Sequence, residues 1–63
     1  MSVKKGISFE EVAEGRTYRN NVNCIIKINS IDKKTRFMKI YNVSEACNSF
    51  IYYRDDYFIE LIR

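Results

Sequence analysis

The sequence predicts a mainly β protein, a small antiparallel barrel of five strands with at most one short helical turn near the N-terminus. The chain has 63 residues, which is enough for one domain with a small core. β-Branched and aromatic residues dominate its C-terminal two-thirds in short blocks separated by polar turn residues, and it contains no proline. We expect residues 1–6 to be a flexible tail and residues 7–63 to be the folded domain.

The segment before these blocks permits two interpretations. In the first, Ser8 and Glu11 form a capping box and Gly15 ends a short helix over residues 9–14. In the second, the chain turns at Gly15 into a first strand over residues 16–19. The residues favour the helical turn over the second interpretation, although a helix this short gains little from propensity alone.

Four blocks predict the other strands, at residues 22–31, 36–43, 50–54 and 57–62. The connections between them are polar and short, at residues 32–35, 44–49 and 55–56. Connections of this length join neighbouring antiparallel strands, so the blocks predict a meander in which each strand pairs with the preceding one.

Hairpin geometry then assigns side chains to the faces of the first hairpin. With its turn centred on residues 33–34, Ile28 lies opposite Lys39. The predicted core face holds Val22, Cys24, Ile26, Ile28, Phe37, Tyr41 and Val43. The other face exposes three apolar side chains, those of Ile25, Met38 and Ile40.

The same alternation applies to the last hairpin, centred on residues 55–56. Its predicted buried face holds Phe50, Tyr52, Tyr57, Ile59 and Leu61. Its other face carries Ile51, Tyr53, Phe58 and Ile62. Because both faces of the sheet are partly apolar, we expect it to curl into a barrel, and we expect a homodimer contact or another partner on the second face.

Three stretches of the chain carry a resemblance to a known group of proteins. They are Phe9-x-x-Val12-x-x-Gly15-x-x-Tyr18, Ile26-Lys27-Ile28 and Asp56-Tyr57-Phe58-Ile59-Glu60-Leu61. Across residues 7–62 this pattern resembles the small SH3-like barrel proteins of phages and other mobile elements. The resemblance implies a turn at Gly15, an anchor for the first strand at Tyr18, and a closing strand through Ile59 and Leu61. The chain departs from the pattern in having no glycine or Asn-Gly turn at its hairpins.

Composition excludes several kinds of chemistry. The chain has no histidine, and its two glycines, Gly6 and Gly15, are too far apart for a phosphate-binding loop. Cys24 and Cys47 form no CxxC pair, so Cys24 is interpreted as a small buried hydrophobe and Cys47 as a loop thiol. We therefore expect no enzyme activity, cofactor or metal. Without a signal peptide or a membrane-length apolar run, we expect a cytoplasmic protein, in the host cytoplasm if viral.

Charge is unevenly distributed. The chain has 11 Lys and Arg against 8 Asp and Glu, a net charge of +3. Seven of the cations lie within residues 16–39, where Asp32 is the single acidic residue. We call these seven the basic set: Arg16, Arg19, Lys27, Lys33, Lys34, Arg36 and Lys39. With Tyr18, Phe37 and Tyr41 nearby, this set is suited to nucleic acid, to an acidic protein surface, or simply to keeping a sheet edge soluble.

Two functions follow from these residues. The first is a non-enzymatic binding module, encoded by a phage or mobile element, that modulates a host protein or nucleoprotein as an inhibitor or adaptor. Its interface would be apolar: Ile25, Met38, Ile40, Ile51, Tyr53, Phe58 and Ile62. The alternative is an accessory protein that binds DNA or RNA through the basic set. Because acidic residues nearly balance basic ones and no recognition helix is predicted, the sequence favours the protein-binding module.

Overall fold

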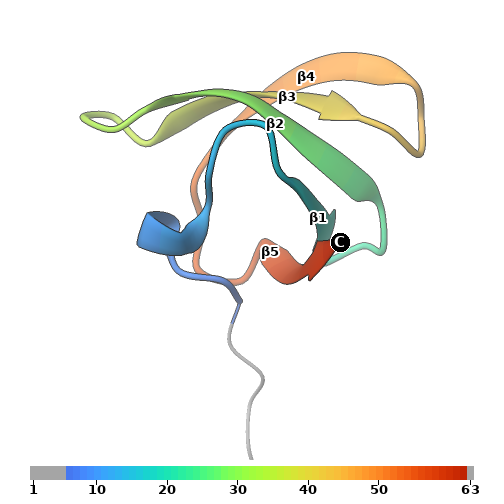
Figure 1. The fold of residues 1–63 in the computed structure, drawn as a ribbon, viewed down its shortest axis with the longest axis horizontal. Coiled ribbons are helices and arrows are strands. Elements are labelled where there is room, and N and C mark those ends of the chain that lie inside the picture. The colour runs from blue at the N-terminus through green and yellow to red at the C-terminus, as the bar shows by residue number, and fades with distance from the viewer. Residues whose placement is uncertain (1–5, 63) are drawn as a thin grey trace, which may run out of the picture.

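The computed structural model describes residues 6–62, which form one curled antiparallel sheet of five strands (Figure 1). The elements are the 3-10 turn η1 (Phe9–Glu11) and the strands β1 (Thr17–Asn20), β2 (Ile25–Asp32), β3 (Phe37–Asn42), β4 (Cys47–Tyr52) and β5 (Phe58–Ile62). In Figure 1, β2, β3 and β4 arch over one side of the molecule, and β1 and β5 lie beneath them. The predicted mainly β class with one short helical turn is confirmed.

The strand order is β4-β3-β2-β1-β5, so β4 and β5 are the two edges of the sheet. Strands β1 to β4 form the predicted meander, but the predicted hairpin between the last two blocks is wrong. β5 pairs instead with β1, with Tyr18 opposite Leu61 and Arg19 opposite Glu60. This pairing places the ring of Phe58 5.4 Å from that of Tyr18, edge to face, which closes the core at one end.

The register between β2 and β3 also differs from the prediction. Ile28 lies opposite Ile40 and Ile31 lies opposite Met38, with a bulge between these two pairs. The turn uses four residues, 33–36, and Arg36 adopts a left-handed φ of +63°. Because side chains alternate between the faces of a strand, the resulting shift moves the core set of β3 to the opposite face.

The observed register determines which apolar side chains are buried. Met38 and Ile40, predicted to be exposed, are 0% and 2% exposed. Val22 and Val43, predicted to lie in the core, are 70% and 47% exposed. The buried core is Val12, Tyr18, Ile26, Ile28, Met38, Ile40 and Phe58.

The N-terminal segment combines parts of both interpretations. Residues Phe9–Glu11 form a single 3-10 turn, but the Ser8 side chain caps nothing, so the predicted capping box does not form. Gly15, at φ +83°, turns the chain into β1. The Tyr18 hydroxyl connects the two pieces, because it donates to the Glu11 carbonyl (3.0 Å) and accepts from the Ala13 amide (2.9 Å).

The predicted tail, residues 1–6, lies outside the described residues except for Gly6. Gly6 packs so closely against β5 that a Cβ there would collide with the carbonyl oxygens of Asp55 and Phe58. The next amide, that of Ile7, donates to the Phe58 carbonyl at 2.6 Å. The folded part of the chain therefore includes Gly6.

Asn20 is the one polar residue in the buried set of the described chain, and we expect its side chain to hold the β1–β2 turn. Its Oδ1 accepts from the amides of Val22 (3.1 Å) and Cys24 (2.7 Å), and its Nδ2 donates to the Tyr57 hydroxyl (3.0 Å). Asn20→Ala leaves these buried partners unsatisfied, so we expect it to lower the free energy of unfolding by about 1–3 kcal/mol.

Urea denaturation followed by circular dichroism measures this loss, with Asn21→Ala at the neighbouring exposed position as the control. The control should change stability by no more than about 0.5 kcal/mol. Equal stabilities for the two variants would show that the Asn20 side chain does not hold the turn.

Candidate functional site

The side of the sheet turned away from the core gathers aromatic and basic side chains from β2, β3 and β4. The register sets Lys27 opposite Tyr41 and Lys39 opposite Phe50, and it sets Phe37 opposite Tyr52. Paired residues of antiparallel strands point to the same side, so these side chains share one surface. We call this surface the outer face: Lys27, Phe37, Lys39, Tyr41, Asn48, Phe50 and Tyr52.

Three rings of the outer face pack against one another and form what we call the aromatic cluster. The Phe37 ring lies 5.5 Å from that of Phe50 and 5.2 Å from that of Tyr52. Phe50 and Tyr52 are nonetheless 66% and 63% exposed. Large apolar rings left in water do not stabilise a small domain, so this cluster is suited to contact with another molecule.

Lys39 adjoins the aromatic cluster, opposite Phe50, and Lys27 lies farther along the same face, opposite Tyr41. Lys27 and Lys39 are both exposed, and neither forms an ion pair with any residue in the described part of the chain. A shallow hollow beside Lys39 is lined by Asn29, Asn48 and Phe50. The outer face therefore offers flat apolar rings, amide groups and free positive charge within one small area.

The remaining basic residues do not join this surface as one group. Lys33 and Lys34 are exposed at the tip of the β2–β3 turn, where the Asp32 carboxylate accepts from the Lys34 amide at 3.0 Å. Arg16 is exposed before β1. The basic set predicted from the sequence is thus divided among the outer face, the turn tip and the β1–β5 side.

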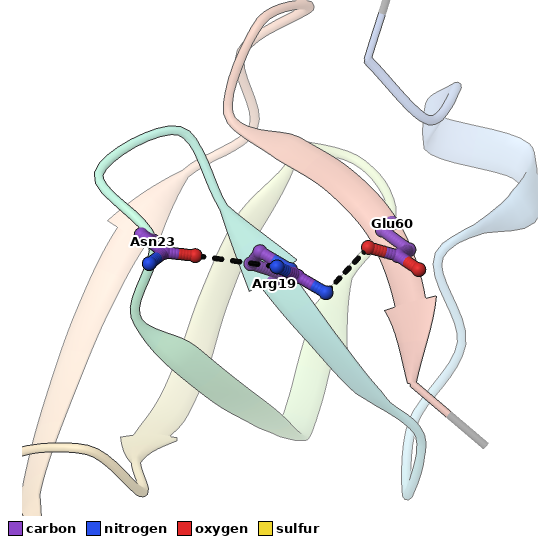
Figure 2. Close-up of polar contacts among 3 residues, drawn as sticks. All are labelled: Arg19, Asn23 and Glu60. Carbon is purple, nitrogen blue, oxygen red and sulfur yellow. Dashed lines mark hydrogen bonds and ion pairs between the residues drawn. The ribbon is translucent and has the colours of Figure 1, made fainter.

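Arg19 is already engaged within the protein. Figure 2 shows it on β1 between Glu60 of β5 and Asn23. One guanidinium nitrogen lies 2.6 Å from the Glu60 carboxylate, and the other donates to the Asn23 side chain at 3.4 Å. With side chains about half exposed, such a pair contributes little stability, about 0–1 kcal/mol. The pair nevertheless neutralises the positive charge of Arg19. Arg19 is therefore a poor candidate for binding a partner.

Arg36 is directed toward η1. Its guanidinium carbon lies 5.0 Å from the centre of the Phe9 ring and 6.0 Å from that of Tyr53. Burial, followed by the nearby carboxylates of Asp55 and Glu10, raises the pKa of Tyr53 above its usual 10.0. The phenol is therefore neutral at physiological pH and donates to the Ile7 carbonyl at 2.7 Å.

The apolar interface predicted from the sequence is not exposed as a surface. Met38, Ile40 and Phe58 are core residues, and Ile25, Ile51, Tyr53 and Ile62 are half-buried. The sequence instead placed Phe50 and Tyr52 in the core and so missed the aromatic cluster. Along residues 47–53, the odd-numbered and the even-numbered positions each mix apolar and polar side chains. The alternation therefore does not indicate which of the two sets is exposed and which is buried.

The two cysteines differ in burial. Cys24 is half-buried against the core, in line with its interpretation as a small hydrophobe. Cys47 is exposed, but its interpretation as a loop thiol is wrong, because it is the first residue of β4. Both are free thiols. Over residues 6–62, no helix is long and apolar enough to cross a membrane.

Comparisons with protein-family models, with curated proteins and with solved structures find no match for this chain. The chemistry of the outer face is therefore the basis on which a function is proposed.

Proposed function

We propose that this chain is a non-enzymatic binding module whose outer face binds single-stranded nucleic acid. The observation that carries the proposal is the aromatic cluster, with two strongly exposed rings, beside the free charge of Lys39 and on the same face as that of Lys27. Of the two functions that the sequence left open, this is the alternative one. It is preferred because the apolar interface of the other has several of its members in the core.

The surface chemistry supports this kind of ligand. Single-stranded nucleic acid presents unstacked bases, which stack on aromatic side chains, and phosphates, which lysines neutralise. Phe50 and Tyr52 offer two rings on one strand, two residues apart, and Lys39 lies across from Phe50 on the next strand. In duplex DNA the base faces are hidden, so the same surface favours single strands.

We take the curled sheet to be a partly open SH3-like barrel, as the resemblance to small phage and mobile-element proteins implies. Its support is the order of the strands, a meander from β1 to β4 followed by a last strand that returns to β1. In that setting the ligand would be met in the host cytoplasm.

Binding is tested by fluorescence anisotropy with labelled single-stranded DNA and RNA of mixed sequence, and with a duplex of the same sequence. We expect both single strands to bind more tightly than the duplex. Each of Phe50→Ala and Tyr52→Ala should weaken binding by at least about fivefold, because base stacking on one ring contributes about 1–3 kcal/mol. Val22→Ala, at an exposed position on the β1–β2 turn, is the matched apolar control and should bind normally.

The lysines are tested through the salt dependence of the same measurement. Replacing Lys27 and Lys39 together by Gln should reduce the steepness of the log–log salt dependence by about 1.4, since each phosphate contact on a single strand contributes about 0.7. Lys33→Gln with Lys34→Gln is the matched control, and it tests whether the turn tip also contacts phosphates. A wild-type protein that binds no oligonucleotide at low salt contradicts the proposal and leaves a protein partner as the ligand of the outer face.

A further inference from the structure

β4 forms an edge of the sheet, and half of its backbone groups face away from β3. The Tyr53 amide donates to the Arg36 carbonyl at 2.9 Å, which fixes the phase of the β3–β4 ladder. In an antiparallel pair, hydrogen-bonded residues alternate with residues whose amides and carbonyls point outward. Cys47, Ser49 and Ile51 therefore bond to β3, and Asn48, Phe50 and Tyr52 direct their backbone groups outward.

Nothing in the described residues protects this edge. No charged residue and no proline occurs from Ala46 to Tyr53, and the β3–β4 pairing contains no bulge. Natural proteins protect edge strands with charged side chains, proline or bulges, because an open edge pairs with other chains. The long, uncharged edge of β4 is therefore a surface for strand pairing.

The opposite edge differs. On β5, the Phe58 carbonyl already accepts from the Ile7 amide, Glu60 places a charge on the strand, and its pairing with β1 has an irregular register. These are the protections that β4 lacks. Strand pairing with another molecule is thus expected at one edge of the sheet and not at the other.

We infer that β4 pairs antiparallel with β4 of a second copy of this chain, and that Phe50 lies opposite Phe50 of the second copy on the two-fold axis. In this register Asn48 lies opposite Tyr52 of the other copy. Every outward amide and carbonyl of Asn48, Phe50 and Tyr52 then has a partner. The register also keeps outer-face side chains beside outer-face side chains, and it brings no like charges together between Ala46 and Tyr53.

The second copy fits this edge because the strand is its own complement. A foreign strand would need a matching pattern of side chains, whereas the two-fold pairing supplies one without further requirement. The two sheets would join into one, and the aromatic clusters of the two copies would meet at the axis. The inference concerns the edge and does not depend on what the outer face binds.

The mass of the protein in solution tests the pairing. Sedimentation equilibrium of the wild type should give the mass of a dimer that dissociates on dilution. Asn48→Pro removes an amide that faces away from β3, a position where an edge strand tolerates proline. We expect this variant to have half the mass and an unchanged circular dichroism spectrum. A wild type that stays monomeric at millimolar concentration overturns the inference and leaves the edge to a foreign strand.

A crosslink tests the register in which Phe50 lies opposite Phe50 of the second copy. This test does not depend on whether the Asn48→Pro variant folds. Phe50→Cys is made in a Cys24→Ala, Cys47→Ser background and equilibrated with oxidised and reduced glutathione. Facing residues of a hydrogen-bonded antiparallel pair have Cα atoms about 5.5 Å apart, which a disulfide spans. We expect a covalent dimer, and we expect none for Asn29→Cys, an exposed residue of β2 away from the edge. Equal crosslinking of the two variants overturns the register.

Discussion

Phe58→Ala is expected to remove about 3–5 kcal/mol from the free energy of unfolding, which is most of the stability that a domain of this size has. The Phe58 side chain is 0% exposed, and three tyrosine rings surround it. Their centres lie 4.9 Å (Tyr57), 5.4 Å (Tyr18) and 6.5 Å (Tyr53) away. Removing the ring leaves a cavity where β1, β5 and the segment before β5 meet.

The measurement is urea denaturation, and the matched control is Phe50→Ala, the same chemical change on a ring that is 66% exposed. We expect the control to change stability by less than about 1 kcal/mol. Its stability also shows whether any loss of nucleic-acid binding in that variant reflects the surface or the fold. Similar losses for the two variants would mean that β5 does not close the core.

Met38→Lys is expected to cost about 3–5 kcal/mol as well, because it places a charge in the core with no carboxylate beside it. Met38 is 0% exposed on β3, whereas its neighbour Phe37 is half-buried on the outer face. Phe37→Lys removes the contacts of that ring with Phe50 and Tyr52, at about 0.2–1 kcal/mol for each pair.

The two substitutions together decide the phase of β3, since the register predicted from the sequence gives the opposite result. In that register Phe37 is a core residue and Met38 is exposed. Thermal unfolding followed by circular dichroism compares the variants directly. A larger loss for Phe37→Lys than for Met38→Lys would restore the predicted register and would remove the outer face as described.

Strand β4 has two roles in these proposals, and its geometry makes them compatible. The rings of Phe50 and Tyr52 project from the outer face. The backbone amides and carbonyls of the same residues lie in the plane of the sheet and point away from β3. Pairing at the edge therefore extends the outer face and does not cover it. A dimer would present two aromatic clusters to one nucleic-acid strand. Loss of the dimer should therefore reduce the length of strand that the bound protein covers.

Local sequence determined the class of the fold and the position of most of its elements. Strand propensity and polar connections located β2, β3 and the turns that follow them, and Gly15 marked the turn before β1. The predicted connection at residues 44–49 was too long, because Cys47–Ser49 belong to β4. These features depend on neighbouring residues alone, so a single sequence contains them. The same local reasoning was correct for Cys24, which lies beside buried Ile26 at the start of β2.

The tertiary structure decided the register, the partner of β5 and therefore the candidate site. The phase of β3 depends on the left-handed conformation of Arg36 and on the bulge between Ile28 and Ser30 in β2. The residue types at these positions do not predict a left-handed φ or a bulge. The pairing of β5 with β1 depends on burial of Phe58 against Tyr18, forty residues away in the chain. Because side chains alternate along a strand, one shift in register exchanged Met38 and Ile40 for Phe50 and Tyr52 as the exposed apolar residues. The sequence supplied the side chains of the site, and only long-range packing selected which of them face the solvent.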